Sequence, residues 1–368
     1  METLRIAFVY DVVYPWVKGG VEKRIHELAR RLAKKHEVHV YGYKLWEGNG
    51  EIERDGVFYH GLAPAGRLYI LGRRRPLPML RLAARISRVR DDLRNCDVVD
   101  VQNLFYPGAL ALRGLENALL TWHEFWGNYW LRYWGPLGVF GETAEKALFS
   151  FERHAAVSWK TKLDLAEAGL RKPISLVPNG VDAGLIKSIP PAELESDIIF
   201  VGRLIPEKGV DLLLRALAEV KREIPDVRAV VVGDGPERGR LERLSARLGL
   251  EDSVLFTGFL ESRDEVIAII KASKVFVLPS RREGFGMVAL EAMASGLPVV
   301  TLNAPMNAAR FLVENGRSGF AVGADELGMA VLTLLGDKKL NRKMGAKGKM
   351  LARHYEWENV VGVWLASI

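Results

Sequence analysis

The chain has 368 residues, of which 49% are apolar, and it carries a formal net charge of +7. This length predicts two α/β domains of about 150–180 residues, each with its own core. No apolar run reaches the roughly 18 residues of a membrane-spanning helix, and a single cysteine, Cys96, excludes an internal disulfide and fits a reducing cytosol.

The positive charge is unevenly distributed. Residues 1–180 carry 27 Lys and Arg against 20 Asp and Glu, whereas residues 181–368 carry 25 of each. We therefore expect the first half to meet an anionic partner: a membrane surface, nucleic acid or a phosphorylated substrate. The N-terminal residues enter a strand directly, so we expect no signal peptide and a cytosolic protein. Gln102 is the only glutamine, and scarce thermolabile amides indicate a heat-adapted source.

The chain opens with a strand–helix–strand pattern. Residues 4–10 form an apolar strand, and residues 21–35 have apolar side chains at helical spacing, followed by a second strand at 38–41. Gly19 and Gly20 stand at the start of the helix, where backbone N–H groups have no partner within the helix. Gly20 is therefore either part of a site for an anion or a hydroxyl group, or part of a plain tight turn.

Residues 66–94 are strongly basic. They hold nine arginines and only two acidic residues, Asp91 and Asp92. The arginines are Arg67, Arg73, Arg74, Arg75, Arg81, Arg85, Arg88, Arg90 and Arg94, and the apolar stripe between them is Met79, Leu82, Ile86, Val89 and Leu93. Two interpretations stay open: a helix that inserts its stripe into an anionic membrane, or a helix that packs on the sheet and leaves its basic face in solvent.

A histidine and an aromatic cluster follow the next strands, which we expect at 97–101 and 117–122. His123 and Glu124 stand at the carboxyl end of the second strand, where open parallel sheets bind ligands. The aromatic side chains are Trp122, Phe125, Trp126, Tyr129, Trp130, Tyr133 and Trp134. Part of this cluster belongs to a core, and the rest suits a membrane interface or a sugar or lipid acceptor.

The strand–helix pattern restarts after a linker near 188–191. A strand at 198–201 leads into Gly202-Arg203 and then to Lys208 before a helix at 210–220. Two cations beside a helix start suit a diphosphate. The later Gly-x-Gly at 233–235 is a weak dinucleotide fingerprint, because Pro236 follows it and the third glycine is missing. Gly258 and Phe259 end a strand that could frame a nucleotide base.

Residues 275–301 predict a strand, a glycine loop, a helix and another strand. Glu283, Gly284 and Gly286 lie in the loop, and Glu291 lies in the helix that runs from 287 to 294. The helix start suits a phosphate. Glu291 would repel a phosphate but can accept hydrogen bonds from a ribose diol, each contributing about 1.5–3 kcal/mol. The alternative is an ordinary βαβ unit with exposed glutamates.

Together these motifs resemble the retaining glycosyltransferases of family 4. In chain order the matching motifs are Gly19-Gly20-Val21-Glu22, His123, Pro178-Asn179-Gly180-Val181-Asp182, Gly202-Arg203 with Glu207-Lys208-Gly209, and Glu283 to Glu291. The resemblance covers essentially the whole chain and implies the α/β GT-B fold, with two doubly wound Rossmann-like domains facing a central cleft. We place the acceptor-side domain at 1–185, completed by a C-terminal helix at 355–368 that crosses back to it, and the nucleotide-sugar-binding domain at 186–354.

The resemblance also implies roles for individual residues. Arg203 and Lys208 would hold the donor diphosphate, Glu291 the ribose and Glu283 the donor sugar, and His123 would touch that sugar. The further donor-binding positions are Gly20, Gly202, Gly258, Phe259, Phe285, Gly286, Met287 and Val288. The family often has Gly-Gly and an acidic residue after the position of Thr301, whereas this chain has Asn303-Ala-Pro-Met-Asn-Ala-Ala-Arg310, so no contacts are carried over to that segment.

The implied reaction is retaining transfer of a hexose from a UDP- or GDP-sugar to an acceptor hydroxyl on a lipid-linked or other glycan. The nucleotide sugar is a co-substrate, and we expect no separate cofactor. No Asp-x-Asp pair is present, so we expect no metal. An anionic membrane, on the inner face of the cell membrane, is a candidate partner, and we expect no nucleic acid. The alternatives are a sugar-nucleotide epimerase of the same fold, a soluble transferase with a phosphorylated small acceptor, a nicotinamide-dependent oxidoreductase and a nucleic-acid-binding protein.

Overall fold

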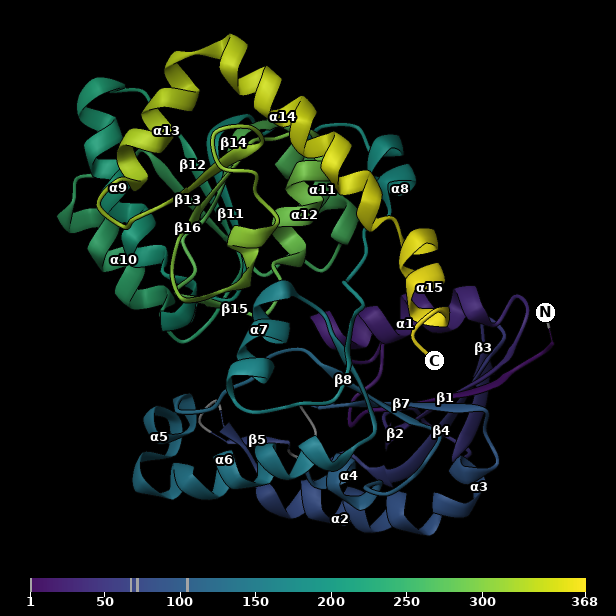
Figure 1. The fold of residues 1–368 in the computed structure, drawn as a ribbon. Helices are drawn as coiled ribbons and strands as arrows, with labels where there is room; N and C mark the ends of the chain where they lie inside the picture. Colours follow the sequence, from purple (N-terminus) through teal and green to yellow (C-terminus); the bar gives the residue numbers. More distant parts are fainter. Residues whose placement is uncertain (1, 67, 71–72, 104–105) are drawn as a thin grey trace. The chain divides into compact units, whose positions relative to one another are not determined.

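Two parallel β-sheets organise the chain, one in each of two units (Figure 1). The computed structural model describes residues 2–66, 68–70, 73–103 and 106–368. Unit 1 is Met1–Asn179 together with Trp357–Ile368, and unit 2 is Gly180–Glu356. No helix among the described residues is both long enough and apolar enough to cross a membrane.

The unit 1 sheet has eight strands in the order β10-β9-β8-β7-β1-β2-β4-β3. Their bounds are β1 Arg5–Val9, β2 Glu37–Lys44, β3 Glu51–Arg54, β4 Val57–Pro64, β7 Val98–Gln102, β8 Ala118–Trp122, β9 Arg153–Ala156 and β10 Ile174–Leu176. Neighbours pair in parallel, except that β3 runs antiparallel to β4. The central strands are buried on both faces, which explains why they appear in the sequence as unbroken apolar runs.

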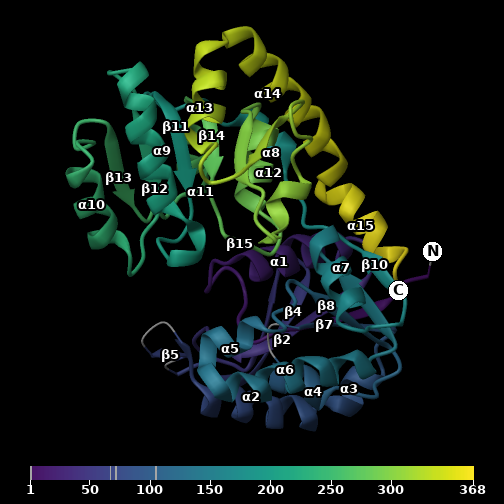
Figure 2. The same ribbon diagram turned by 60° about the vertical axis from the view of Figure 1, so that its left-hand side comes forward.

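Helices cover both faces of this sheet. They are α1 Gly20–Leu32, α2 Pro76–Arg88, α3 Arg90–Arg94, α4 Tyr106–Ala111, α5 Tyr129–Trp134, α6 Gly138–Ala147, α7 Trp159–Glu167 and α15 Trp357–Leu365. Two short strands, β5 Tyr69–Ile70 and β6 Arg73–Arg74, pair antiparallel with each other. In both views α1 and α15 lie on one side of the sheet, and α2, α4 and α6 lie on the other (Figures 1 and 2).

The apolar stripe of residues 66–94 belongs to the core of unit 1. Leu82, Ile86 and Leu93 are completely buried, and Met79 and Val89 pack against them. The hypothesis that this stripe inserts into a membrane is therefore wrong, and the alternative of a helix packed on the sheet is confirmed. The outward face of α2 carries three exposed arginines, Arg81, Arg85 and Arg88. Arg67 lies outside the described residues, as do the side chains of Arg73 and Arg74.

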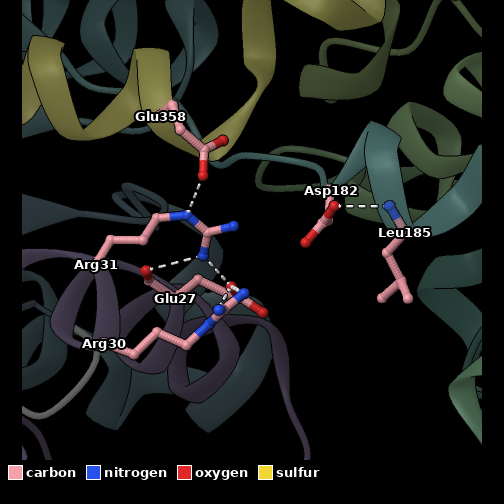
Figure 3. Close-up of polar contacts among 6 residues, drawn as sticks. All are labelled: Glu27, Arg30, Arg31, Asp182, Leu185 and Glu358. Atoms are coloured by element: carbon pink, nitrogen blue, oxygen red, sulfur yellow. Dashed lines mark hydrogen bonds and ion pairs between the residues drawn. The ribbon is translucent and has the colours of Figure 1, made fainter. Parts of the chain in front are cut away.

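The C-terminal helix α15 is part of unit 1. The Arg31 guanidinium on α1 pairs with Glu27 one turn earlier, and its Nε donates to Glu358 of α15 at 2.9 Å (Figure 3). Arg31 also lies 5.9 Å from the ring centroid of Trp357. Beneath this surface contact, Trp364 is fully buried and its indole nitrogen donates to Asp100 on β7 at 2.7 Å. The ion pair between Arg31 and Glu358 and the buried hydrogen bond between Trp364 and Asp100 therefore both hold α15 in unit 1.

The unit 2 sheet has six parallel strands in the order β13-β12-β11-β14-β16-β18. They are β11 Ser196–Val201, β12 Ala229–Val232, β13 Val254–Gly258, β14 Ser273–Leu278, β16 Val299–Leu302 and β18 Gly319–Val322, and a second small sheet pairs β15 Arg282–Glu283 with β17 Met306–Asn307. The order reverses beside β11, so the loops after β11 and β14 leave the sheet at the switch point where such folds bind ligands.

The helices of unit 2 are α8 Ala183–Ser188, α9 Val210–Glu223, α10 Arg238–Arg247, α11 Arg263–Lys271, α12 Met287–Ser295, α13 Leu327–Gly336 and α14 Lys338–Ala352. Asp182 caps the first of them, since its carboxylate accepts a hydrogen bond of 2.9 Å from the backbone N–H of Leu185 (Figure 3). The backbone N–H of Val181 donates to the Tyr355 carbonyl at 2.8 Å, so the first and last residues of unit 2 are tied together.

Candidate functional site

The loop after β11 presents Arg203 to solvent. Its side chain is exposed, and among the described residues it makes no hydrogen bond or ion pair. The loop lies against the Gly-x-Gly turn after β12, where a Cβ on Gly233 would stand 2.0 Å from the Gly202 carbonyl oxygen. A Cβ on Gly235 would stand 2.4 Å from the Leu204 carbonyl oxygen. These two glycines therefore permit close packing beneath the Arg203 loop, which accounts for the incomplete dinucleotide fingerprint.

Lys208 and Glu283 form an ion pair that joins the loops after β11 and β14. Lys208 Nζ lies 2.5 Å from Glu283 Oε2, and both side chains are largely buried. The approach depends on Gly209, which has φ 66° and would place a Cβ 2.1 Å from the Pro279 carbonyl oxygen. Glu283 is further fixed by its position in β15, paired with Asn307 of β17. A cation and a carboxylate predicted separately from the sequence are thus brought together.

The N-terminus of α12 has no side-chain cap. Gly286 occupies the cap position with φ 97°, and a Cβ there would meet Ala309 Cβ at 2.7 Å. Met287 and Val288 are half-buried in the first turn, so their N–H groups are available to an anion. Phe285 is different, because its side chain is buried with its ring 6.0 Å from that of Tyr355, leaving only its backbone to serve a ligand.

Glu291 lies in the second turn of α12 and is 4% exposed. Its carboxylate pairs with Arg263, the first residue of α11. Sequence reasoning missed Arg263, because nothing in the local pattern links positions that are 28 residues apart. The arginine offsets part of the cost of burying the carboxylate beside the helix start.

The loop after β13 carries the candidate base contacts. Gly258 has φ 79°, and its carbonyl accepts from the Gly233 N–H at 2.8 Å, which fixes this loop against the neighbouring one. Phe259 follows with 59% of its surface exposed. An exposed ring on a fixed turn can stack on a nucleotide base.

The segment that departs from the family pattern has a structural role. Asn307 is completely buried, and its amide donates to Thr301 Oγ1 at 2.9 Å and to the Leu302 carbonyl at 2.8 Å. Its side-chain oxygen accepts from the backbone N–H of Ala309 at 3.0 Å. Asn307 therefore positions Ala309 against Gly286, and through it the start of α12.

His123 of unit 1 follows β8 and is buried. Its ring Nε2 lies 2.7 Å from Gln102 Oε1, and its backbone N–H donates to Asn103 Oδ1 at 2.9 Å. Burial, with a smaller effect of the Arg24 charge, lowers the pKa of His123 to about 3, so the imidazole is neutral near pH 7. Gly20, by contrast, is exposed in the first turn of α1, whose cap position Gly19 makes no side-chain hydrogen bond.

A buried carboxylate holds the aromatic segment that follows His123. Glu145 is completely buried and accepts hydrogen bonds from Tyr106, Trp130 and the backbone N–H groups of residues 126 and 127 at 2.8–3.2 Å. Burial raises the pKa of Glu145, and these four donors oppose that shift. Trp122 and Trp130 are buried, whereas five apolar side chains within positions 131–140 are exposed: Leu131, Trp134, Leu137, Val139 and Phe140. We call these five residues the α5–α6 apolar patch.

Two family models match the chain. "Glycosyltransferase Family 4" matches residues 18–185, and "Glycosyl transferases group 1" matches residues 185–350. An uncharacterized glycosyltransferase of Haemophilus influenzae is 32% identical over 265 residues, which span 70% of this chain and 71% of the relative. The chain is a group 1 glycosyltransferase of the family 4 type.

More distant relatives cover nearly the whole glycosyltransferase chain. A GDP-mannose-dependent α-(1-6)-phosphatidylinositol monomannoside mannosyltransferase of Mycolicibacterium smegmatis is 27% identical over 371 residues, covering 94% of this chain and 92% of the relative. The structure of a sucrose-phosphate synthase from Thermosynechococcus elongatus is 21% identical with a TM-score of 0.79, covering 98% of this chain and 97% of the other. The family and the GT-B fold predicted from the sequence are confirmed.

The part of the glycosyltransferase that the structure describes contains no group of three or more His, Cys, Asp or Glu side chains that could hold a metal ion. Arg203, Lys208 and the N-terminus of α12 bring positive charge to the candidate site.

Proposed function

We propose that this glycosyltransferase moves a hexose from a UDP- or GDP-sugar to an acceptor hydroxyl with retention of the anomeric configuration. The observation that carries the proposal is the grouping in unit 2 of an exposed Arg203, the Lys208–Glu283 pair and the uncapped start of α12. Cations and unpaired N–H groups suit a diphosphate. The mannosyltransferase relative, named for its use of GDP-mannose, adds support for a nucleotide-sugar donor.

Each element of the site has a proposed task. Arg203, Lys208 and the first N–H groups of α12 bind the diphosphate, and Gly202 and Gly286 allow its close approach. Glu291 accepts hydrogen bonds from the ribose hydroxyls, and the Phe259 ring stacks on the base beside Gly258. Glu283 accepts from hydroxyls of the donor sugar, and His123 contacts the same sugar.

The reaction proposed is a front-side substitution. The bond from the anomeric carbon to the diphosphate oxygen breaks, and its electron pair leaves with the phosphate. The sugar carries oxocarbenium character while an oxygen of the acceptor attacks from the face that the phosphate has left. The acceptor proton passes to the departing phosphate oxygen, so no separate base is required. The two cations and the α12 terminus stabilise the negative charge that develops on the diphosphate.

The donor class is tested by a thermal-shift screen with UDP, GDP, UDP-glucose and GDP-mannose. One nucleoside diphosphate and its sugar are expected to raise Tm by several degrees at millimolar concentration, because a ligand that binds the folded protein at 100 times its Kd adds about 2.7 kcal/mol. AMP and NAD serve as controls that should cause no shift. A shift with NAD alone would favour the oxidoreductase alternative and contradict the proposal.

Transfer is expected to survive exhaustive treatment with EDTA, because Arg203 and Lys208 supply the positive charge that a metal would otherwise supply. Release of the nucleoside diphosphate is measured before and after chelation, and again with added Mg²⁺ or Mn²⁺. Loss of release on chelation together with its recovery on adding either metal would show that the metal-free mechanism is wrong.

We further propose that unit 1 docks on an anionic membrane and that the acceptor is lipid-linked. The α5–α6 apolar patch supports this, because Phe140 and Leu137 expose 72% and 64% of their surface. Such exposed apolar groups commonly mark a contact surface. Arg132 lies within the same segment and is exposed, and Arg81, Arg85 and Arg88 are exposed on α2, which lies on the same side of the sheet as α6 (Figures 1 and 2).

Co-sedimentation with liposomes tests the docking. Each basic residue near an anionic surface contributes about 1 kcal/mol, so binding should rise with anionic lipid and fall with salt. Replacing Arg81, Arg85 and Arg88 with Ser should weaken binding, and replacing Leu137 and Phe140 with Ser should weaken it independently of salt. A matched triple change on α10, at Arg240, Arg243 and Arg247, should have no effect. Absence of binding to the liposomes at low salt would contradict the proposed membrane docking and favour a soluble acceptor.

A further inference from the structure

A buried polar network lies behind His123 in unit 1. Gln102 Nε2 donates to Asp100 Oδ1 at 2.7 Å, and Gln102 Oε1 lies 2.7 Å from His123 Nε2. Asp100 also accepts from Thr121 Oγ1 at 2.6 Å and from Trp364 Nε1 at 2.7 Å. Asp100, Gln102 and Thr121 are all at most 1% exposed. The only glutamine in the chain thus stands between a carboxylate and the histidine.

Asp100 is the hydrogen-bond acceptor at one end of this network. Burial raises the pKa of Asp100, and this is opposed by the Thr121 hydrogen bond, the Arg24 charge and the hydrogen bonds of Trp364 and Gln102. Arg24 is itself 1% exposed, and burial lowers its pKa only to about 10, so it remains a cation near neutral pH. A buried cation requires a nearby anion. The Asp100 charge raises the Arg24 pKa and so favours the cation, although no hydrogen bond of Arg24 reaches Asp100.

The orientation of the Gln102 amide fixes the proton on His123. The two oxygens of Asp100 accept hydrogen bonds from Thr121 and Trp364, and Gln102 turns its NH₂ group to Asp100 as a further donor. Its carbonyl oxygen then faces His123 and can only accept, so the proton of the neutral imidazole must be on Nε2. This leaves Nδ1 with a lone pair. Among the described residues, no protein group donates to Nδ1.

We propose that Gln102, held by Asp100, is a positioning residue that locks His123 in the Nε2–H tautomer and so presents Nδ1 as a fixed hydrogen-bond acceptor for a hydroxyl group of the donor sugar. The inference rests on the proposed role of His123 as a contact for that sugar. His123 then selects a sugar that carries a hydroxyl donor at this point, and it transfers no proton during the reaction. Trp364 extends the network to the C-terminal helix, which gives α15 a role in setting the histidine.

The tautomer is measured without any ligand by long-range ¹H–¹⁵N NMR of the full chain at pH 7. The signal of His123 is identified as the one missing from a His123→Asn sample among the seven histidines. A neutral ring with the proton on Nε2 and an unprotonated Nδ1 is expected. An Nδ1–H ring, or an imidazolium, would overturn the proposal, and this result does not depend on whether the enzyme uses nucleotide sugars.

Gln102→Met tests the positioning, because methionine keeps the length of the side chain but makes neither hydrogen bond. The His123 signal of the variant should change to a mixture of tautomers. The affinity of the sugar-bearing ligand, GDP-mannose or UDP-glucose, should fall about tenfold, as for loss of one well-placed hydrogen bond. The affinity of GDP or UDP, which lack the sugar, should not change.

Different outcomes contradict the positioning role of Gln102 and the proposed function of the enzyme. An unchanged tautomer in Gln102→Met, or an equal loss of affinity for GDP and GDP-mannose, would overturn the positioning role. Binding of none of the four nucleotides to the wild-type protein would contradict the proposed function, while the wild-type spectrum alone still decides the tautomer. A Gln102→Met protein that fails to fold leaves the wild-type spectrum as the deciding test.

Discussion

Replacing Arg203 or Lys208 with alanine is expected to lower kcat by about 10²- to 10³-fold, which corresponds to roughly 2.7–4 kcal/mol of barrier. The reason is that each side chain offers a positive charge where negative charge develops on the leaving diphosphate. Arg203 is exposed and has no partner among the described residues, so its removal should leave the fold unchanged. Lys208 also neutralises Glu283, so its removal should disturb the donor sugar as well as the diphosphate.

Release of the nucleoside diphosphate measures this loss, and circular dichroism confirms that each variant is folded. Arg222→Ala is the matched control, because Arg222 is an exposed arginine at the end of α9 in the same unit. The control should retain wild-type turnover. Turnover near the wild-type value in both the Arg203 and the Lys208 variant would contradict the assignment of the diphosphate site.

Replacing Asp100 with leucine is expected to lower the free energy of unfolding of unit 1 by about 3–5 kcal/mol, because Thr121, Gln102 and Trp364 would lose their shared buried acceptor and the buried Arg24 would lose the charge that favours it. Arg24 has few alternatives: Nη1 donates to the Pro178 carbonyl at 2.5 Å and to Asn179 Oδ1 at 3.1 Å, whereas Nε and Nη2 are buried without a hydrogen-bond partner. The change would also release the Trp364 indole and thereby loosen α15.

Urea unfolding followed by circular dichroism measures the loss. The matched control is Asp91→Leu, which removes a carboxylate 2.9 Å from Arg94 on the surface and should cost no more than about 1 kcal/mol. A loss for Asp100→Leu no larger than that of the control would contradict the stabilising role of Asp100 toward Arg24, Thr121, Gln102 and Trp364.

Much of the fold could be predicted from local patterns. The apolar runs at 198–201 and 275–278 became the neighbouring strands β11 and β14, because fully buried parallel strands leave a continuous apolar signature. The loops that follow such strands meet at one edge of the sheet, so Arg203, Lys208 and Glu283 could be predicted as neighbours from their positions alone. Lys208 and Glu283 form an ion pair between these two loops, and their roles toward a donor stay proposals.

Other features depend on tertiary contacts that no local pattern encodes. Asp100 and Trp364 are 264 positions apart, and Glu291 meets Arg263 only because α11 and α12 are adjacent. The one clue in the sequence was an aspartate inside the apolar run 98–101, since a charge at the centre of a buried strand requires partners. The apolar stripe of residues 66–94 could not be assigned either, because periodicity identifies an amphipathic face but not whether protein or lipid covers it.

The most direct test of the proposed chemistry is incubation of the purified chain with a panel of UDP- and GDP-sugars, with release of UDP or GDP followed over time. We expect one of these donors to be consumed and its nucleoside diphosphate to appear. Release should persist in EDTA and fall at least a hundredfold in the Arg203→Ala, Lys208→Ala double variant. No release from any donor, or release that the double variant retains in full, would contradict the proposed function.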